Sequence, residues 1–495
     1  MSELQDLSSL VRSNTPLIVI ETPDEARVVD LFRHVLTNVW RALYRWSITE
    51  GMRRVDLDRE DPPEGPADIT STLMAMKAND QRGIYLLLDV MPYLGYATTQ
   101  RMLREILERR GSLEHTVVFV GNKIELTPEL EALAVRFTLS LPDENALLKM
   151  VNDEAGLYKR ENGGRRVEVD KAALAILVRN LRGLSLGEAR RIARQLIYAD
   201  GAIGEADLPE LSKLKFELLN KSGHLHFEYD TARFSDVAGL NRLKQWIGHR
   251  REFFSGEEMP VGLDPPKGIL LLGVQGCGKS LAAKAVAGGF GVPLVRLDFG
   301  TLYNKFHGET EKNLRDALAS AEQLAPCVLW IDELEKGLSS SGSSEDGGVS
   351  RRVLGYFLTW MAERKSRVFL VATANAVQEL PPELLRKGRF DEIFFVDLPD
   401  HSARAEIFRL HLEKRRVDWS TFSLGKLSEA SAGFSGAEIE QAIVSALYAA
   451  HADKATVDEA SIIREIRGTR PLSVLMAEQV EALRDWAKTR TVPAD

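Results

Sequence analysis

The segment that most constrains the fold is a glycine-rich loop, GVQGCGKS, which lies between two largely apolar runs. It fits the pattern Gly-x-x-x-x-Gly-Lys-Ser, with Gly273, Gly278, Lys279 and Ser280 in register. The run before it, KGILLLG, predicts a buried strand, and the run after it, KSLAAKAVAGGF, predicts a helix. This order predicts an α/β fold with a phosphate-binding Walker A loop at the helix N-terminus. A glycine-rich turn before a core helix is the alternative.

The residues of this loop have separate expected roles. The ammonium of Lys279 is expected to reach the β and γ phosphates of a nucleotide, and the hydroxyl of Ser280 is expected to bind Mg²⁺. Three further candidate nucleotide-binding residues lie in or just after the loop: Gly276, Cys277 and Leu281. Because a modified thiol would crowd the loop, oxidation of Cys277 is expected to block the site.

Two further apolar runs end in polar residues that suit nucleotide hydrolysis. CVLWIDELEKG, a Walker B pattern, predicts a strand followed by Asp332, which would bind Mg²⁺, and Glu333, which would accept a proton from water. RVFLVATAN predicts a strand followed by Asn375, which would orient that water. Since parallel strands end at one edge of a sheet, these residues are expected beside the loop. A surface turn for the acidic pair and a helix cap for Asn375 are the alternatives.

Two arginines follow in the segment ELPPELLRKGRFDEIFFVDLPD. The planar, always charged guanidinium of Arg386 or Arg389 suits a γ-phosphate whose charge redistributes during transfer. If a neighbouring subunit supplies it, hydrolysis depends on assembly. A surface salt bridge is the alternative for either arginine.

From about residue 234 to residue 495 the chain resembles a module of the AAA family (ATPases associated with diverse activities). FSDVAGLNRLKQWI is similar to the lead-in segment of the family, and GFSGAEIEQAI is similar to part of its helical lid. The residues that the resemblance places beside the adenine are Val237, Ala238, Gly239, Gly436 and Ala437. It also implies ATP and Mg²⁺ as ligands, ATPase activity that yields ADP and phosphate, and a homo-oligomeric ring, usually a hexamer.

Two departures from the family pattern affect the site. Cys277 stands where the family usually has threonine, and the lid segment GFSGAE carries no arginine. The second departure is typical of the unfoldase branch and implies that Arg386 and Arg389 stabilise the developing charge. More narrowly, the layout resembles AAA proteins known mainly as conserved open reading frames of cyanobacterial and plastid genomes.

A loop before the expected helix ETEKNLRDAL contains Phe306, His307 and Gly308. In unfoldase-type AAA rings, an aromatic-aliphatic-glycine loop here lines the central pore and grips an extended polypeptide, and His307 replaces the aliphatic residue. An ordinary core or helix-staple role for Phe306 is the alternative. The segment GLSSSGSSEDGGVSRR occupies the position of a second pore loop and is expected to be mobile.

The first half of the chain repeats the second half in a weaker form. PLIVIETPDEARVVDLF lines up with the phosphate-loop segment, IYLLLDVMPYL with VLWIDELEKGL, and VVFVGNKIELTPEL with FLVATANAVQELPPEL. The matches lie about 250 residues apart and in the same order, which predicts a tandem duplication. Coincidental similarity between two α/β segments is the alternative.

The first copy has lost the residues of the chemistry. Its loop, ETPDEAR, has no glycine or lysine, and the carboxylates of Glu21, Asp24 and Glu25 would repel a triphosphate. Val90 follows Asp89, which matches Asp332, so the catalytic base is expected to be missing. Apart from a lone Arg136, no residue matches the arginine pair. We expect this copy to be a scaffold for assembly, docking or regulation.

The predicted fold class is therefore α/β. It is a P-loop NTPase of AAA type with a C-terminal helical lid, preceded by a degenerate AAA-like α/β module with its own small helical domain. The expected boundaries are 1–140 for the degenerate α/β domain, 141–204 for its helical domain, 205–232 for a linker that includes a helix, 233–397 for the catalytic α/β domain and 398–495 for the lid.

Composition excludes several other classes of protein. The 495 residues are 44% hydrophobic and 27% charged, which is ordinary for a globular protein, and the net charge of −8 weighs against broad nucleic-acid binding. The two cysteines, Cys277 and Cys327, form no disulfide framework and favour a reducing compartment. Without an apolar signal segment or a run long enough to span a membrane, a cytoplasmic location is expected.

These features predict a homo-oligomeric ATPase that couples ATP hydrolysis to remodelling or threading of a protein partner, either a substrate or an adaptor. One alternative is a nucleotide-controlled regulatory or scaffolding switch without threading. A nucleic-acid remodelling ATPase is the other, and the acidic net charge, the Phe306 loop and the lack of a recognisable nucleic-acid module weigh against it.

Overall fold

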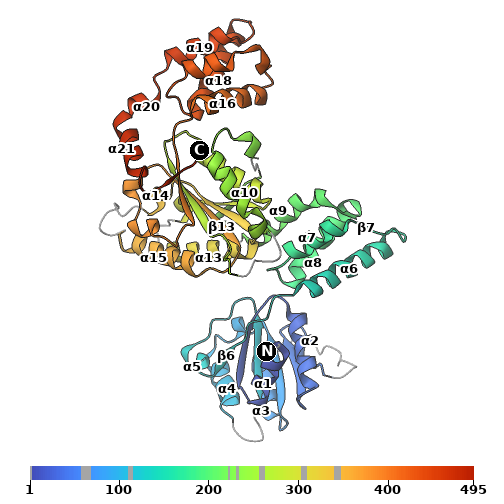
Figure 1. Cartoon of the computed structure of the whole chain (residues 1–495). Helices are drawn as coiled ribbons and strands as arrows, with labels where there is room; N and C mark the ends of the chain where they lie inside the picture. The colour runs from blue at the N-terminus through green and yellow to red at the C-terminus, as the bar shows by residue number, and fades with distance from the viewer. Residues whose placement is uncertain are drawn as a thin grey trace. The chain divides into compact units, whose positions relative to one another are not determined.

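The computed structural model describes residues 3–56, 68–109, 115–220, 223–229, 234–255, 262–302, 309–338 and 347–495. The chain forms two compact units, residues 1–157 with 182–194 and residues 158–181 with 195–495. Each unit has its own α/β sheet (Figure 1). The predicted pore loop of Phe306, His307 and Gly308, and residues 339–346 of the second pore-loop segment, lie outside the described residues.

The first unit contains a six-stranded sheet with the strand order β3-β2-β4-β5-β1-β6. All neighbouring strands are parallel except β2 and β3. Because apolar cores cover both faces, β4 and β5 are buried along their whole length and are continuous apolar runs. The strands are β1 Leu17–Glu21, β2 Ala42–Ser47, β3 Gly51–Arg54, β4 Gly83–Leu88, β5 Thr116–Gly121 and β6 Ala134–Arg136. The helices are α1 Glu3–Arg12, α2 Glu25–Leu36, α3 Ile69–Ala78, α4 Ala97–Leu107 and α5 Pro128–Glu131.

After the first sheet the chain is mostly helical as far as residue 219. The elements are α6 Glu144–Glu161, β7 Glu168–Val169, α7 Lys171–Asn180, α8 Leu186–Asp200, β8 Ala202–Ile203 and α9 Leu208–Leu219. The segment 205–232, predicted as a linker that includes a helix, holds the helix α9 and also a strand of the second sheet that was not predicted, β9 Leu225–Phe227. Phe216 and Leu225 lie in the core of that sheet. The charged residues between these apolar positions obscured the pattern.

The second unit contains a seven-stranded sheet with the strand order β15-β14-β10-β13-β12-β11-β9. β9 is antiparallel to β11, and the other neighbouring strands are parallel. Its other strands are β10 Gly268–Gly273, β11 Leu294–Leu297, β12 Cys327–Ile331, β13 Val368–Ala374, β14 Glu392–Val396 and β15 Val492–Pro493. Its helices include α10 Asn241–Ser255, α11 Lys279–Phe290, α12 Phe299–Leu302, α13 Glu309–Leu324, α14 Leu334–Leu338 and α15 Gly347–Glu363.

Helices cover both faces of the second sheet (Figure 1). Along β10, Ile269 and Leu271 face the core with α10 and α11, whereas Leu270 and Leu272 face the core with α13 and α15. This alternation is the period of a strand, and it explains why β10 is apolar throughout. The predicted α/β fold is therefore confirmed. Among the described residues, no helix combines the length and the apolar character that crossing a membrane requires.

Four helices after the sheet form a lid with a separate core: α16 His401–Lys414, α17 Leu424–Ala430, α18 Gly436–Ala452 and α19 Glu459–Gly468. The chain then returns to the sheet through α20 Leu472–Leu475 and α21 Ala477–Ala487 (Figure 1). Leu483 and Ala487 lie in one core of the α/β domain, and Ala494 lies in the other. The lid predicted over 398–495 is therefore too long. The amphipathic pattern of α21 resembles that of a lid helix and does not show which core it joins.

Candidate functional site

A cavity of about 1380 Å³ lies at the edge of the second sheet where β10, β12, β13 and β14 end. Its walls come from the loop after β10, the residues after β12 and β13, the segment before α10, and the lid. Ligands of parallel α/β sheets bind beyond the carboxyl ends of the strands, so the cavity lies where the fold predicts a site.

The loop between β10 and α11 requires glycine at two positions. Gly276 and Gly278 have φ angles of 78° and 86°, in the left-handed region that favours glycine. A Cβ atom on Gly276 would also lie 2.9 Å from Oγ of Ser435, at the start of the lid helix α18. Because Gly278 offers no side-chain cap to α11, the first N–H groups of that helix suit a bound anion.

Lys279 is buried, with 6% of its surface exposed. Its Nζ donates to the carbonyl oxygens of Gly273 at 2.9 Å and Val274 at 2.8 Å. Burial lowers the pKa of Lys279 to about 8, although nearby carboxylates oppose the shift. Neutral carbonyls orient this ammonium without neutralising it, and a phosphate would supply the opposite charge.

Ser280 and Asp332, the predicted magnesium ligands, are hydrogen-bonded. Oγ of Ser280 donates to Oδ1 of Asp332 at 3.3 Å. The Thr373 hydroxyl, at the end of β13, also donates to Asp332 and accepts from the N–H of Glu333 at 3.0 Å. Hydroxyl and carboxylate oxygens are ligands that Mg²⁺ prefers, and Mg²⁺ is usually shared with substrate phosphates. No group of three His, Cys, Asp or Glu residues in the described chain is arranged to hold a metal by itself.

Glu333 has a φ angle of 49°, which is uncommon for a residue other than glycine and typical of functional positions. Its Oε1 accepts from Nδ2 of Asn375 at 3.4 Å, and its Oε2 pairs with Nζ of Lys336 at 2.7 Å. The structure therefore brings together the predicted base and the predicted water-orienting amide, which follow neighbouring strands.

Glu335 is a buried carboxylate beside the site that the sequence reasoning missed, and it does not itself line the cavity. It is 3% exposed, and its Oε1 accepts from the backbone N–H of Asn375 at 2.9 Å. Its Oε2 is buried without a hydrogen-bond partner among the described residues, and burial raises its pKa. The third carboxylate in DELEKG was the available signal.

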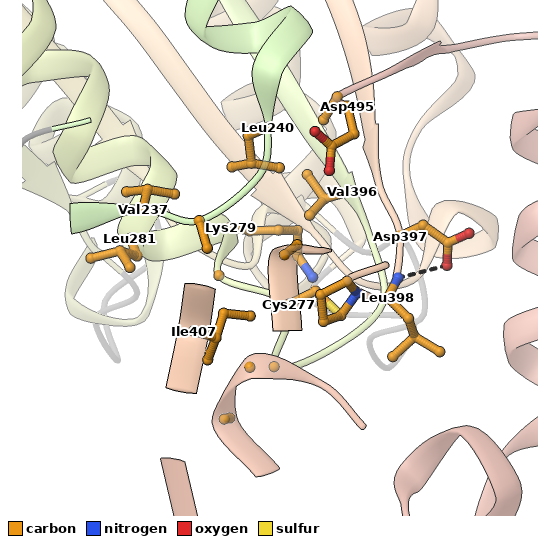
Figure 2. Close-up of a pocket in the computed structure, with 18 of the residues that line it drawn as sticks. Val237, Leu240, Cys277, Lys279, Leu281, Val396, Asp397, Leu398, Ile407 and Asp495 are labelled. Carbon is orange, nitrogen blue, oxygen red and sulfur yellow. Dashed lines mark hydrogen bonds between the residues drawn. The ribbon is translucent and has the colours of Figure 1, made fainter. Parts of the chain in front are cut away.

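The segment before α10 and the lid complete the cavity. Val237, Ala238 and Leu240 line it, and the N–H of Ala437 donates to the carbonyl oxygen of Gly276 at 3.1 Å. Figure 2 shows Val237, Leu240 and Leu281 on one side of the cavity with Lys279, and Ile407, from α16, on another. The predicted nucleotide-binding residues that line the cavity are Val237, Ala238, Gly276, Cys277, Gly278, Lys279, Ser280, Leu281, Gly436 and Ala437. Gly239 and Gly273 lie behind this lining.

Two lid residues that the sequence reasoning missed, His411 and Glu440, also line the cavity. Nδ1 of His411 lies 3.5 Å from Oε1 of Glu440, which accepts a hydrogen bond of 2.7 Å from Nη2 of Arg415. Burial lowers the pKa of His411. These residues come from α16 and α18, so no local motif joins them.

Cys277 is half-buried in the loop that follows β10. Burial raises the pKa of its thiol to about 12. Since the thiolate is the form that oxidants attack, this raised pKa disfavours oxidation of the thiol near neutral pH. The environment of Cys277 therefore argues against the expected block by oxidation.

Arg386 and Arg389 do not line the cavity of their own chain. Arg386 is exposed. Arg389 is half-buried, and its Nη1 donates to the carbonyl oxygen of Leu358 on α15. The structure thus leaves both arginines outside the group formed by Lys279, Asp332 and Glu333.

The corresponding edge of the first sheet corrects one sequence match. Leu88 pairs with Val120, two residues before Asn122, whereas Ile331 pairs with Ala372, three residues before Asn375. If Asn122 and Asn375 are taken as equivalent positions, the strand pairing places Asp89 at the position of Glu333. It does not place Asp89 at the position of Asp332. The φ angles of Asp89 and Glu333 agree, at 46° and 49°. The position of the base keeps a carboxylate, and Leu88 stands where the magnesium ligand would be.

Charged residues of the first unit pair with one another at this edge. Glu21, the last residue of β1, accepts from Nη1 of Arg136 at 3.3 Å and from the N–H of Ile124 at 2.9 Å. Arg136 also pairs with Glu131 at 3.0 Å. Arg136, which is the first-copy residue that matches the arginine pair, is therefore paired with two carboxylates.

Comparison with known proteins agrees with the geometry. Residues 269–398 match the family model described as "ATPase family associated with various cellular activities (AAA)". Residues 3–139 match the N-terminal domain of SpoVK-like AAA ATPases, and residues 145–222 match their second domain.

Two similar relatives extend over nearly the whole chain. A protein of Pyropia yezoensis named "Uncharacterized AAA domain-containing protein ycf46" is 35% identical over 489 residues, which is 98% of each chain. A protein of Guillardia theta with the same name is 35% identical over 494 residues, covering 98% of this chain and 95% of the relative. The ATPase family protein 2 homolog of Caenorhabditis elegans is 39% identical over 221 residues, 43% of this chain and 30% of its own length.

Proposed function

The chain belongs to the AAA family of ATPases, in the group of ycf46-like proteins, and from this premise we propose that it binds ATP with Mg²⁺ and hydrolyses it to ADP and phosphate. The observation that carries the proposal is the grouping of buried Lys279 with the hydrogen-bonded pair of Ser280 and Asp332 at one edge of the sheet. Lys279 provides positive charge for the phosphates, and Ser280 and Asp332 provide oxygen ligands for Mg²⁺.

In the proposed reaction Glu333 takes a proton from the attacking water. The Asn375 amide lies 3.4 Å from Glu333, so one side chain accepts the proton while the other orients the water. Lys336 pairs with the other oxygen of Glu333 and limits its rotation. Mg²⁺, when bound, neutralises charge on the phosphate oxygens.

Replacing the proposed base tests this function. Glu333→Gln is expected to keep ATP affinity within about threefold and to lower turnover by about 10²-fold or more, because the amide does not accept the proton. ATP binding is measured by titration calorimetry and turnover by phosphate release. Glu363→Gln, which changes an exposed glutamate outside the cavity, is the matched control. Unchanged turnover in Glu333→Gln contradicts the assignment of the base, and a wild-type chain that does not bind ATP contradicts the function.

We propose that the active form is a homo-oligomeric ring, a hexamer, in which Arg386 and Arg389 act on the site of a neighbouring subunit. Their place outside their own cavity supports this arrangement. An arginine supplied from another subunit stabilises transferred phosphate charge only after assembly.

We further propose that the ring remodels or threads a protein partner. The support is the Phe306 loop in the sequence. An unfolded model protein is expected to stimulate ATP hydrolysis by the wild type, and Phe306→Ala is expected to keep the basal rate and lose the stimulation. Equal stimulation of both proteins contradicts a grip by Phe306. A wild type whose rate does not respond favours the regulatory switch.

A further inference from the structure

The last strand of the second sheet brings a distant segment to the nucleotide cavity. β15 pairs in parallel with β14, with Val492 opposite Phe394 and Pro493 opposite Phe395. Parallel strands end at the same edge, so the residues after β15 emerge where the loop after β10 lies. Ala494 and Asp495 both line the cavity.

The helix beside this edge, α10, has no cap from its own sequence. It begins at Asn241, and its first internal hydrogen bond runs from the N–H of Lys244 to the carbonyl oxygen of Leu240 at 2.9 Å. Leu240 is therefore the N-cap, where Ser, Thr, Asp or Asn is preferred, and its side chain offers no acceptor. Its φ angle of 57° is also unfavourable for a residue with a bulky side chain.

Ala494 and Asp495, more than 200 residues further along the chain, supply the missing acceptors. Oδ1 of Asp495 accepts from the N–H of Asn241 at 3.1 Å and from its Nδ2 at 2.8 Å. The carbonyl oxygen of Ala494 accepts from the N–H of Leu243 at 3.0 Å. The N–H of Ala494 donates to the carbonyl oxygen of Phe395 at 2.9 Å. Two of the free N–H groups of α10 are satisfied in this way, and a carboxylate near a helix N-terminus is favourable.

Asp495 also lies close against the turn before α10. Gly239 has a φ angle of 62°, and a Cβ atom there would lie 2.7 Å from Oδ2 of Asp495. The residues on either side of Gly239, Ala238 and Leu240, line the cavity, as does Val237. Figure 2 shows Leu240 and Asp495 at the same end of the cavity.

We infer that residues 492–495 are a positioning element of the nucleotide site: they hold the turn Val237–Leu240 in the conformation that receives the base, and they thereby set the affinity for ATP. This inference rests on the proposed function. It concerns the base end of the cavity only, because the hydrogen bonds of Lys279, Ser280 and Asp332 are made with residues outside 492–495.

The test uses the whole chain of 495 residues and compares two ligands, ATP and inorganic tripolyphosphate, which both carry a triphosphate and differ in that only ATP has a base. Asp495→Ala is expected to weaken ATP binding about fivefold, the size of a lost helix cap, and to leave tripolyphosphate binding within about twofold. Turnover at saturating ATP is expected to stay unchanged. Asp495→Asn keeps an acceptor oxygen and is expected to restore most of the affinity. Glu478→Ala, an exposed carboxylate on α21 outside the cavity, is the control.

The outcomes separate the possible failures. Equal ATP affinity in the wild type and Asp495→Ala overturns the inference and leaves the proposed function intact. Parallel losses of ATP and tripolyphosphate binding, with a lower melting temperature, also overturn it, because residues 492–495 would then stabilise the whole domain. A wild type that binds neither ligand overturns the proposed function itself.

Discussion

The two α/β units use similar sheets and differ at the loop that follows the first strand of the repeat. In the second unit residues 274–278 separate β10 from α11, and two of them are glycines in the left-handed region. In the first unit only residues 22–24 separate β1 from α2, and the Asp24 side chain caps the helix by accepting from the N–H of Arg27. The shorter loop carries acidic residues, and the Asp24 carboxylate occupies an N–H of the helix N-terminus that would otherwise be open to a phosphate.

Other parts of the site changed less than this loop. Asp89 keeps the backbone conformation of Glu333, and Asn122 keeps the place of Asn375. Leu88 has replaced the magnesium ligand. The comparison teaches that a carboxylate and an amide at the right strand ends do not make a nucleotide site. The loop, its lysine and the metal ligand are what separate the two units.

The largest expected effect is the loss of nucleotide binding. The second unit depends on Lys279 for positive charge, and the first unit has no counterpart, so we expect one ATP per chain and none in Lys279→Ala. Equilibrium dialysis with labelled ATP measures the number of nucleotides bound per chain in the wild type and in Lys279→Ala. Two bound nucleotides per wild-type chain, or residual tight binding in Lys279→Ala, breaks the contrast between the units.

The next effect concerns Arg389 of the second unit and Arg136, its match in the first unit. Arg389→Ala is expected to keep ATP binding and to lower turnover by roughly 10³-fold, because it removes charge stabilisation from the neighbouring site. Arg136→Ala is the matched change in the first unit. Because Arg136 is paired with Glu21 and Glu131 at an exposed position, this change is expected to leave turnover unaltered.

Mixing variants tests whether the sites form between subunits. Equal amounts of Arg389→Ala and Glu333→Gln are expected to recover part of the activity, since some subunit pairs then combine an intact arginine with an intact base. Mixed oligomers confirmed by cross-linking that show no recovery contradict action from a neighbouring subunit.

A smaller effect comes from pH. Burial gives Lys279 a pKa of about 8, so it is charged below pH 8 and loses its proton above it. Bound phosphates favour the ammonium and raise that pKa, so binding above pH 8 takes up a proton. ATP affinity is therefore expected to be flat below pH 8 and to fall about tenfold per pH unit above it. Calorimetry in buffers of different ionisation enthalpy measures the proton directly. Constant affinity up to pH 10 contradicts a buried, titrating lysine.

The sequence was enough to predict the central strands β10, β12 and β13 and their counterparts β1, β4 and β5, and it did not predict β2, β11 or the short edge strands. β10, β12 and β13 are buried on both faces, so each is a continuous apolar run that can be recognised as a strand from the sequence. β9 and β15 are short edge strands, and what places them is pairing with β11 and β14. Such pairing between distant segments cannot be predicted from the residues of either segment alone.

The same distinction applies to the site. Asp332 and Asn375 directly follow strands, and Lys279 ends the loop that follows β10, so the predicted sheet brings the three residues together. Glu335 and His411 were not assigned: the acidic run DELEKG offered a signal for Glu335, but the burial of both residues depends on packing between elements far apart in sequence. The match of Asp89 to Asp332 was off by one residue. Apolar residues precede both aspartates, and strand register is what distinguishes the two positions.

The smallest expected effect lies inside the loop that separates the units, at Cys277. Burial keeps its thiol protonated, with a pKa of about 12, and Sγ lies 3.9 Å from the carbonyl oxygen of Gln275. Cys277→Thr, which introduces the residue usual in the family, is expected to change ATP affinity and turnover by less than about twofold, because the backbone and Lys279 form the phosphate contacts. Brief treatment with peroxide at pH 7 is expected to leave wild-type turnover unchanged. Rapid inactivation that Cys277→Thr prevents would show that the thiol is reactive, and that this loop adds redox control which the first unit lacks.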